Sequence, residues 1–184
     1  MADLLSKAEI KKVISELKNL TAIVENIQKK SGPYSIFQFP KTPPTLTESI
    51  AYHLINDGKI LQGKKFSKIL FNEKATKHAG SRKMPTDLIG KIGNSGEFLI
   101  EVKGTRKPSQ FTQFGQKDVD SDCIVWIDYG FSFQALGKIG IEVAVIENPR
   151  KAGLKAAKYT WDSASFSRVQ SKKLRFSSFT DLLR

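Results

Sequence analysis

The feature that most constrains the fold of this chain is a strand–turn–strand pattern in its middle. Residues 87–92 and 97–103 are rich in apolar residues, and a Gly-Asn-Ser-Gly cluster at 93–96 separates them. A cluster of this kind between two extended runs is typical of a β-hairpin. Two further apolar runs, 123–128 and 140–147, have the length and composition of buried strands. We therefore expect an α/β fold in which helices flank a central mixed β-sheet.

Two helices are expected before the hairpin. Within residues 4–30, apolar residues recur at alternating spacings of three and four, as in a heptad seam. This helix either packs on its own domain or forms a dimer interface, and Gly32 and Pro33 end it. A second helix is expected to begin at Thr45, whose spacing to Glu48 is that of a capping box. The residues of the seam are Ile10, Val13, Leu17, Leu20, Val24 and Ile27.

The chain is expected to contain one domain preceded by the first helix. Residues 1–32 hold the amphipathic helix, and residues 33–184 hold a domain whose C-terminal part mixes basic with aromatic residues. Lysine and arginine number 30 against 18 acidic residues, so the formal net charge is +12 and favours polyanionic partners. No apolar run approaches the roughly 18 to 20 residues that span a bilayer, and a signal-peptide pattern is missing. A cytoplasmic protein without a membrane partner is therefore expected.

The hairpin places charged groups where they can act together. Side chains of a strand alternate between faces, so Glu101 and Lys103 project together, and pairing through the turn brings Asp87 beside Glu101. Mg²⁺ prefers oxygen ligands, so we expect Asp87, Glu101 and the Val102 carbonyl to bind Mg²⁺, with Mn²⁺ able to substitute. A bound metal can activate water for phosphodiester hydrolysis, and Lys103 can orient the nucleophile. The alternative is an ordinary exposed ion pair, with Asp87 in a turn.

These residues resemble a known catalytic motif. Pro85-Thr86-Asp87, followed by Glu101-Val102-Lys103, is similar to the motif of the PD-(D/E)xK nuclease superfamily, although Thr86 separates the proline from the acid. The resemblance covers about residues 48–147. It implies a restriction-endonuclease-like fold and a Mg²⁺-dependent endonuclease, with Asp87, Glu101 and Lys103 as catalytic residues. Many members carry a further acidic residue on the preceding helix, and Glu48 matches that place. The resemblance therefore makes Glu48 a fourth catalytic candidate, which would coordinate the metal directly or through water; helix capping is its alternative role.

The superfamily contains several kinds of nuclease, so the substrate must be inferred from flanking features. One domain with an extra N-terminal helix and a basic, aromatic C-terminal segment most resembles a type II restriction enzyme. Such an enzyme would act on double-stranded DNA as a homodimer, beside a cognate DNA methyltransferase. The His-Ala-Gly-Ser-Arg segment at 78–82 is similar to a loop of archaeal Holliday-junction resolvases, which are the second candidate. A non-catalytic DNA-binding module is the third.

Polar and basic residues around the motif are candidates for DNA contacts. Lysine and arginine bind phosphates, and glutamine can hydrogen-bond to base edges. Residues 108–122 are expected to form a loop rich in glutamine and aromatic residues, so exposed loop polarity is the alternative for the glutamines. A solvated surface is the alternative for the lysines. The candidates are Arg82, Lys83, Gln113, Gln116, Lys172 and Lys173.

Overall fold

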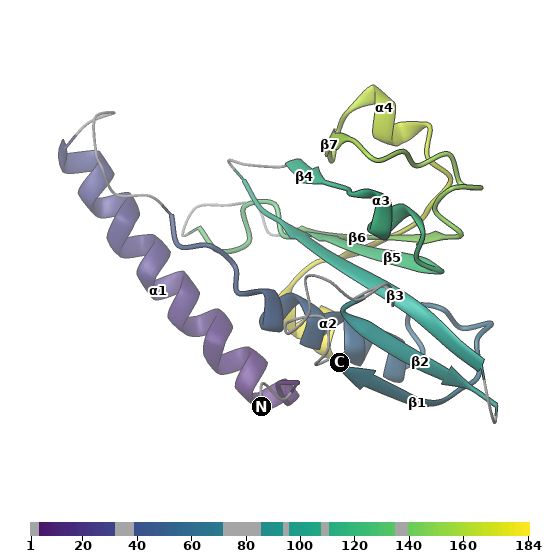
Figure 1. Ribbon diagram of the computed structural model, residues 1–184. Helices are drawn as coiled ribbons and strands as arrows, with labels where there is room; N and C mark the ends of the chain where they lie inside the picture. Colours follow the sequence, from purple (N-terminus) through teal and green to yellow (C-terminus); the bar gives the residue numbers. More distant parts are fainter. Residues whose placement is uncertain (1–3, 32–38, 72–85, 94–95, 108–110, 135–139) are drawn as a thin grey trace.

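The computed structural model describes residues 4–31, 39–71, 86–93, 96–107, 111–134 and 140–184. Its centre is a six-stranded sheet in the order β1-β2-β3-β5-β6-β8 (Figure 1). Strands β3 and β5 are parallel, and the other neighbouring pairs are antiparallel, so the predicted mixed sheet is confirmed. The strands are β1 (Phe66–Phe71), β2 (Leu88–Ile92), β3 (Gly96–Thr105), β5 (Cys123–Asp128), β6 (Ile141–Glu147) and β8 (Lys172–Phe176).

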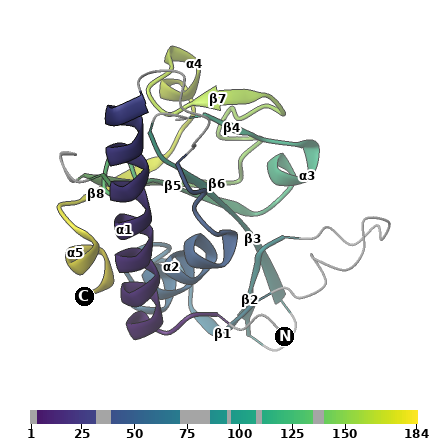
Figure 2. The ribbon, with the colours of Figure 1, turned by 90° about the vertical axis from the view of Figure 1, so that its left-hand side faces the viewer.

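Helices cover one face of this sheet. Figures 1 and 2 show α2 against the sheet and α1 lying across α2 on its outer side. The apolar residues of these helices pack against alternate residues of the strands, among them Val125 and Ile127 of β5. The α/β class with flanking helices is therefore confirmed. The helices on this face are α1 (Lys7–Ser31), α2 (Pro44–Asn56) and α5 (Phe179–Leu183).

The opposite face carries a smaller second layer around a cluster of aromatic rings. Trp126 of β5 lies at its centre, with ring centroids 4.8 Å from Trp161 and 4.5 Å from Phe166. Because both faces are covered, every residue of β5 is buried. Residues 108–122 were expected to form a loop, but the described part contains the short strand β4 and the helical turn α3. Phe114, between these two elements, packs against Trp126 and anchors the segment on the sheet. The layer consists of β4 (Phe111–Gln113), α3 (Gln116–Val119), β7 (Lys158–Thr160) and α4 (Ala164–Ser167).

Helix α1 matches the predicted helix, but it buries a different stripe. Its buried residues are spaced at the 3.6-residue period of a helix packed on its own domain, and Leu5 before it donates its N–H to Ser49 Oγ at 2.8 Å. The predicted seam is wrong at Leu20, whose side chain is 50% exposed. Ile23, which is not a seam residue, is 54% exposed. Packing on the domain therefore explains the apolar residues in the first half of α1. A dimer contact through the exposed apolar residues of its second half stays a prediction. The buried stripe is Ile10, Ile14, Leu17 and Thr21.

Helix α2 begins earlier than the sequence indicated. Pro43 occupies the N-cap position without a side-chain hydrogen bond, and Pro44 is the first helical residue. Proline suits this position because it has no N–H to leave unpaired. Thr45 therefore lies inside the first turn, and the predicted capping box with Glu48 is wrong.

Among the described helices, none combines the length and the apolar character that a membrane span requires.

Candidate active site

The candidate site lies at a fork between β2 and β3. The two strands pair as far as Leu88 and Ile100, and β3 then continues beyond the start of β2. Asp87, the residue before β2, takes over the backbone contact, because its Oδ2 accepts the N–H of Val102 at 2.8 Å. A carboxylate thus replaces the backbone carbonyl that would otherwise continue the ladder. The contact fixes the Asp87 side chain against β3, as the hairpin pattern predicted.

Glu101 and Lys103 lie together on one face of β3. The Glu101 side chain is only 3% exposed, and its Oε1 lies 2.6 Å from Lys103 Nζ. Lys103 Nζ has a second acidic partner, Asp118 Oδ2 of α3, at 3.2 Å. This arrangement is not the exposed surface ion pair that was the alternative for these residues. The ammonium group is held between two buried carboxylates.

A close contact between α2 and β3 brings Glu48 to the site. A Cβ atom on Gly104 would lie 2.7 Å from Thr47 Oγ1, so only glycine allows this approach without a shift. Thr47 Oγ1 also accepts a hydrogen bond from the Tyr129 hydroxyl at 3.2 Å, which fixes the helix from the sheet side. With Thr47 held against the sheet, the adjacent Glu48 lines the same pocket as Asp87.

These elements enclose a pocket of about 320 Å³. The predicted catalytic residues and the predicted metal ligand Val102 all contribute to its wall. So does Lys117 of α3, which no sequence pattern singled out. The lining residues that offer an ionisable side chain are Glu48, Asp87, Glu101, Lys103 and Lys117, and Val102 is the predicted carbonyl ligand.

The carboxyl groups of the pocket resist ionisation. Burial, and then the charge of Asp87, raise the pKa of Glu48 to about 7. The same two causes, in the same order, raise the pKa of Glu101 to about 8, although Lys103 opposes them. Burial also raises the pKa of Asp87, against the N–H of Val102 and the charge of Lys103. Burial lowers the pKa of Lys103, but Glu101 and Asp118 outweigh it, so the net pKa is raised and the amine stays charged.

The donor set fits a divalent cation. Asp87, Glu101 and the Val102 carbonyl offer oxygen atoms, the ligand type that Mg²⁺ prefers, and Mg²⁺ keeps several water ligands of its own. The described residues contain no cluster of three or more His, Cys, Asp and Glu side chains arranged for a metal ion. Burial is the main cause of the raised pKa values of Glu48, Asp87 and Glu101, and once ionised these three groups carry one more negative charge than Lys103 and Lys117 balance. A cation bound there would offset this excess.

The candidate DNA-contact residues are spread over the molecule. Gln113 of β4 and Gln116 of α3 are exposed, and Gln116 stands next to the pocket residue Lys117. The Gln116 side chain donates to Asp120 Oδ1 at 3.1 Å. Arg82 and Lys83 lie outside the described residues.

Lys172 and Lys173 of β8 point to opposite faces of the sheet. Lys173 pairs with Ala144, which pairs with Trp126, which pairs with Lys103, so Lys173 and Lys103 lie in one row on the same face. The rings of Trp161 and Phe166 lie under the Lys173 ammonium, at 5.4 and 4.9 Å. Lys172 pairs with Val145, whose side chain belongs to the core on the other face. Of the two lysines, only Lys173 lies on the face that carries Glu101 and Lys103.

Asp118 is the acidic residue that sequence analysis missed. It lies in a segment interpreted as a polar loop, and its side chain is 1% exposed. A signal was present, because Gly115 and Asp118 have the spacing of an N-cap and an N3 acid. The structure shows that contact: the Gly115 N–H donates to Asp118 Oδ2 at 2.8 Å.

Comparison with known proteins does not identify a family for the chain. No family model matches the sequence, and no curated protein sequence matches it significantly.

Proposed function

We propose that this protein is a Mg²⁺-dependent endonuclease of the PD-(D/E)xK type, which hydrolyses DNA phosphodiester bonds. The observation that carries the proposal is the convergence of Asp87, Glu101 and Lys103 on one pocket at the fork between β2 and β3. The mixed sheet with elements packed on both faces is compatible with a restriction-endonuclease-like fold. The net charge of +12 supports a polyanionic substrate.

The pocket residues have distinct roles in this proposal. Asp87, Glu101 and the Val102 carbonyl hold Mg²⁺. When bound, Mg²⁺ polarises the phosphodiester and lowers the pKa of a water molecule. Lys103 orients the attacking water and stabilises the negative charge that develops on the phosphate. Glu48, with a pKa of about 7, suits a group that takes up a proton from a pocket water near neutral pH.

Among such nucleases, we propose a type II restriction enzyme that cuts double-stranded DNA as a homodimer, beside a cognate methyltransferase. Exposed glutamines on β4 and α3 support this choice, because amide groups can read base edges. The exposed Leu20 and Ile23 on the second half of α1 support a partner surface there. The resemblance to junction resolvases rests on residues 78–82, which lie outside the described residues, and on the Glu101-Val102-Lys103 strand.

A cleavage assay with Mg²⁺ tests the proposal on duplex DNA of phage length and on a synthetic four-way junction. A restriction enzyme gives discrete duplex fragments, and a resolvase nicks the junction alone. Asp87→Asn should abolish either activity. The matched control is Asp122→Asn, because Asp122 Oδ2 also accepts a β3 N–H, that of Leu99 at 2.8 Å, outside the pocket. DNA binding by the wild type without cutting would instead support a non-catalytic binding module.

A further inference from the structure

Asp118 is a buried acidic residue that forms an ion pair with Lys103. Its Oδ2 lies 3.2 Å from Lys103 Nζ and accepts the Gly115 N–H, and its Oδ1 is buried without a hydrogen-bond partner among the described residues. A hydrogen bond from one backbone N–H does not offset the dehydration of a carboxylate, so a buried carboxylate needs a counter-charge. Among the described residues, Lys103 is the cation within ion-pair distance of Asp118.

The two carboxylate partners of Lys103 have different surroundings. Glu101 lines the pocket, where it is proposed to bind a metal ion. Asp118 is held against Gly115 at the start of α3. A carboxylate that binds a divalent cation shares its lone pairs with that cation and attracts an ammonium group less. Without Asp118, Lys103 would depend on Glu101 alone and would compete with the metal for it.

We propose that Asp118 is a positioning residue that holds the Lys103 ammonium, so that Glu101 can bind a divalent cation while Lys103 stays at the site. This inference rests on the proposed function of the pocket. It assigns to Asp118 a role in metal affinity, although Asp118 itself does not bind the metal or touch the substrate.

A purely structural role for Asp118 predicts a different result. If Asp118 serves only as the N3 acid of α3, asparagine at this position should replace it, because the amide oxygen can accept the Gly115 N–H equally well. Asp118→Asn therefore keeps the cap and removes the charge. Because α3 stays capped in this variant, any change in metal affinity reports on the lost charge and not on the loss of the helix.

The test measures binding of Mn²⁺ alone to the full chain, by the electron paramagnetic resonance signal of free aquated Mn²⁺. Asp118→Asn should weaken Mn²⁺ binding about tenfold, the effect expected from one charged hydrogen bond. In a Lys103→Met background the same substitution should change affinity less than about twofold, because no ammonium remains to be held. An equal loss in both backgrounds would overturn the proposal. Asp120→Asn, which removes the exposed partner of Arg150 on the same turn, is the control.

A second measurement needs no variant at position 118. The acetylation rate of the Lys103 amine, followed by mass spectrometry in the wild type, should stay low when Mn²⁺ is added, because Asp118 still holds the ammonium. A rise to the rate of an exposed lysine would overturn the proposal. If the wild type binds Mn²⁺ no better than Asp87→Asn does, the proposed function fails and this inference fails with it. Mn²⁺ binding that is normal in the wild type and unchanged in Asp118→Asn overturns the inference alone.

Discussion

Asp87 has two neighbours that favour opposite protonation states. Burial, and to a smaller extent the charge of Asp118, favour its protonated form, whereas the Val102 N–H stabilises its carboxylate. Glu48 and Glu101 share the same pocket, and burial, followed by the charge of Asp87, raises the pKa of each. The metal-free fold therefore holds acidic groups that would ionise more readily in the unfolded chain.

The metal-free protein should lose stability as the pH rises from about 5 to about 8. The folded-state pKa values of Glu48 and Glu101 are about 7 and about 8, against an ordinary value of 4.5. In this window the unfolded chain has already released protons that the folded chain still binds, so ionisation favours unfolding. Urea unfolding in EDTA at several pH values measures the effect.

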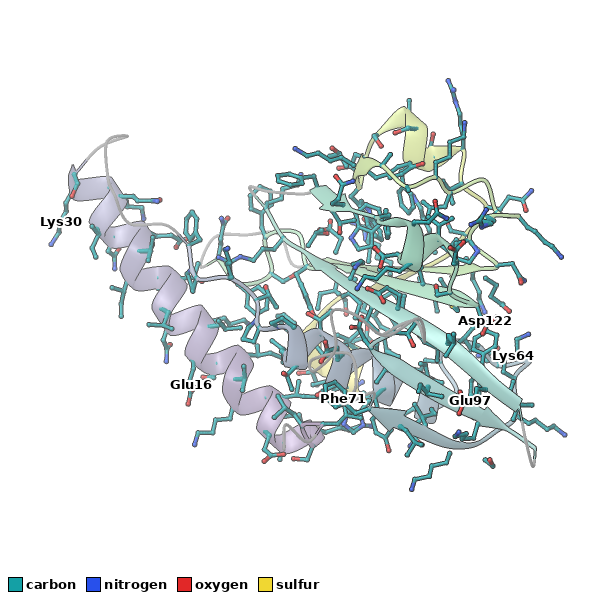
Figure 3. All side chains as sticks on the ribbon, viewed as in Figure 1. Glu16, Lys30, Lys64, Phe71, Glu97 and Asp122 are labelled. Atoms are coloured by element: carbon teal, nitrogen blue, oxygen red, sulfur yellow. The ribbon has the colours of Figure 1, made fainter. Side chains whose placement is uncertain are left out.

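Glu101→Gln should flatten this pH dependence, because the variant carries no carboxyl group at that position. Glu16→Gln on the outer face of α1 is the control and should leave the slope unchanged (Figure 3). Parallel curves for the wild type and Glu101→Gln would show that burial of Glu101 does not have the predicted effect.

Residue alternation predicted part of the site well. It placed Glu101 and Lys103 on one face and Asp87 beside Glu101, because a period of two in a hairpin follows from backbone geometry. The second partner of Lys103 could not be predicted in this way. Asp118 reaches Lys103 through packing between β3 and α3, a tertiary contact that spacing along the chain does not encode.

At the scale of elements, the contact between α2 and β3 decides where Glu48 lies. Gly104→Ala should destabilise the fold by about 1–3 kcal/mol and slow cleavage, because the new Cβ would push Thr47 and its helix away. Gly63→Ala is the control, because a Cβ there meets nothing within 4 Å, and it should cost less than about 0.5 kcal/mol. Equal unfolding free energies for the two variants would contradict this account of the contact.

Strand β8 allows a test of which face of the sheet binds DNA. Lys173 lies in the same row and on the same face as Lys103, whereas Lys172 pairs with a residue whose side chain packs on the other face. If the face that carries Glu101 and Lys103 binds DNA, Lys173→Ala should reduce the slope of log affinity against log salt by about one, and Lys172→Ala should not. Equal effects of the two substitutions would place DNA at the edge of the sheet and not over the site.

The element boundaries show where sequence patterns fail. Thr45 and Glu48 have the spacing of a capping box, but Pro44 starts the helix one residue earlier and makes the cap unnecessary. The apolar residues of α1 match a heptad seam and a 3.6-residue stripe almost equally well. Packing on α2 selects the stripe that contains Ile14 and leaves Leu20 exposed. Tertiary contacts decide between local patterns that the sequence alone leaves equivalent.

In the whole molecule, the fork between β2 and β3 connects the two faces of the sheet. Helix α2 packs on one face and α3 lies in the layer on the other, as the two ribbon views show. Even so, Glu48 from α2 and Lys117 from α3 line one pocket with Glu101. The sheet is open at this point because β3 continues beyond Leu88, the first residue of β2. Groups from both layers can therefore reach one bound group, as phosphodiester hydrolysis in this pocket would require.

The most direct test of this account is the single-turnover cleavage rate of duplex DNA at increasing Mg²⁺, for the wild type and for Lys103→Met. Lys91→Met is the matched control, because Lys91 is also a strand lysine paired with a glutamate, Glu97 of the same hairpin, but lies outside the pocket. The wild type and Lys91→Met should cut at similar rates only with Mg²⁺, and Lys103→Met should be at least about a hundredfold slower. Cleavage in EDTA, or equal rates for the two lysine variants, would contradict the assignment of this pocket as a metal-dependent nuclease site.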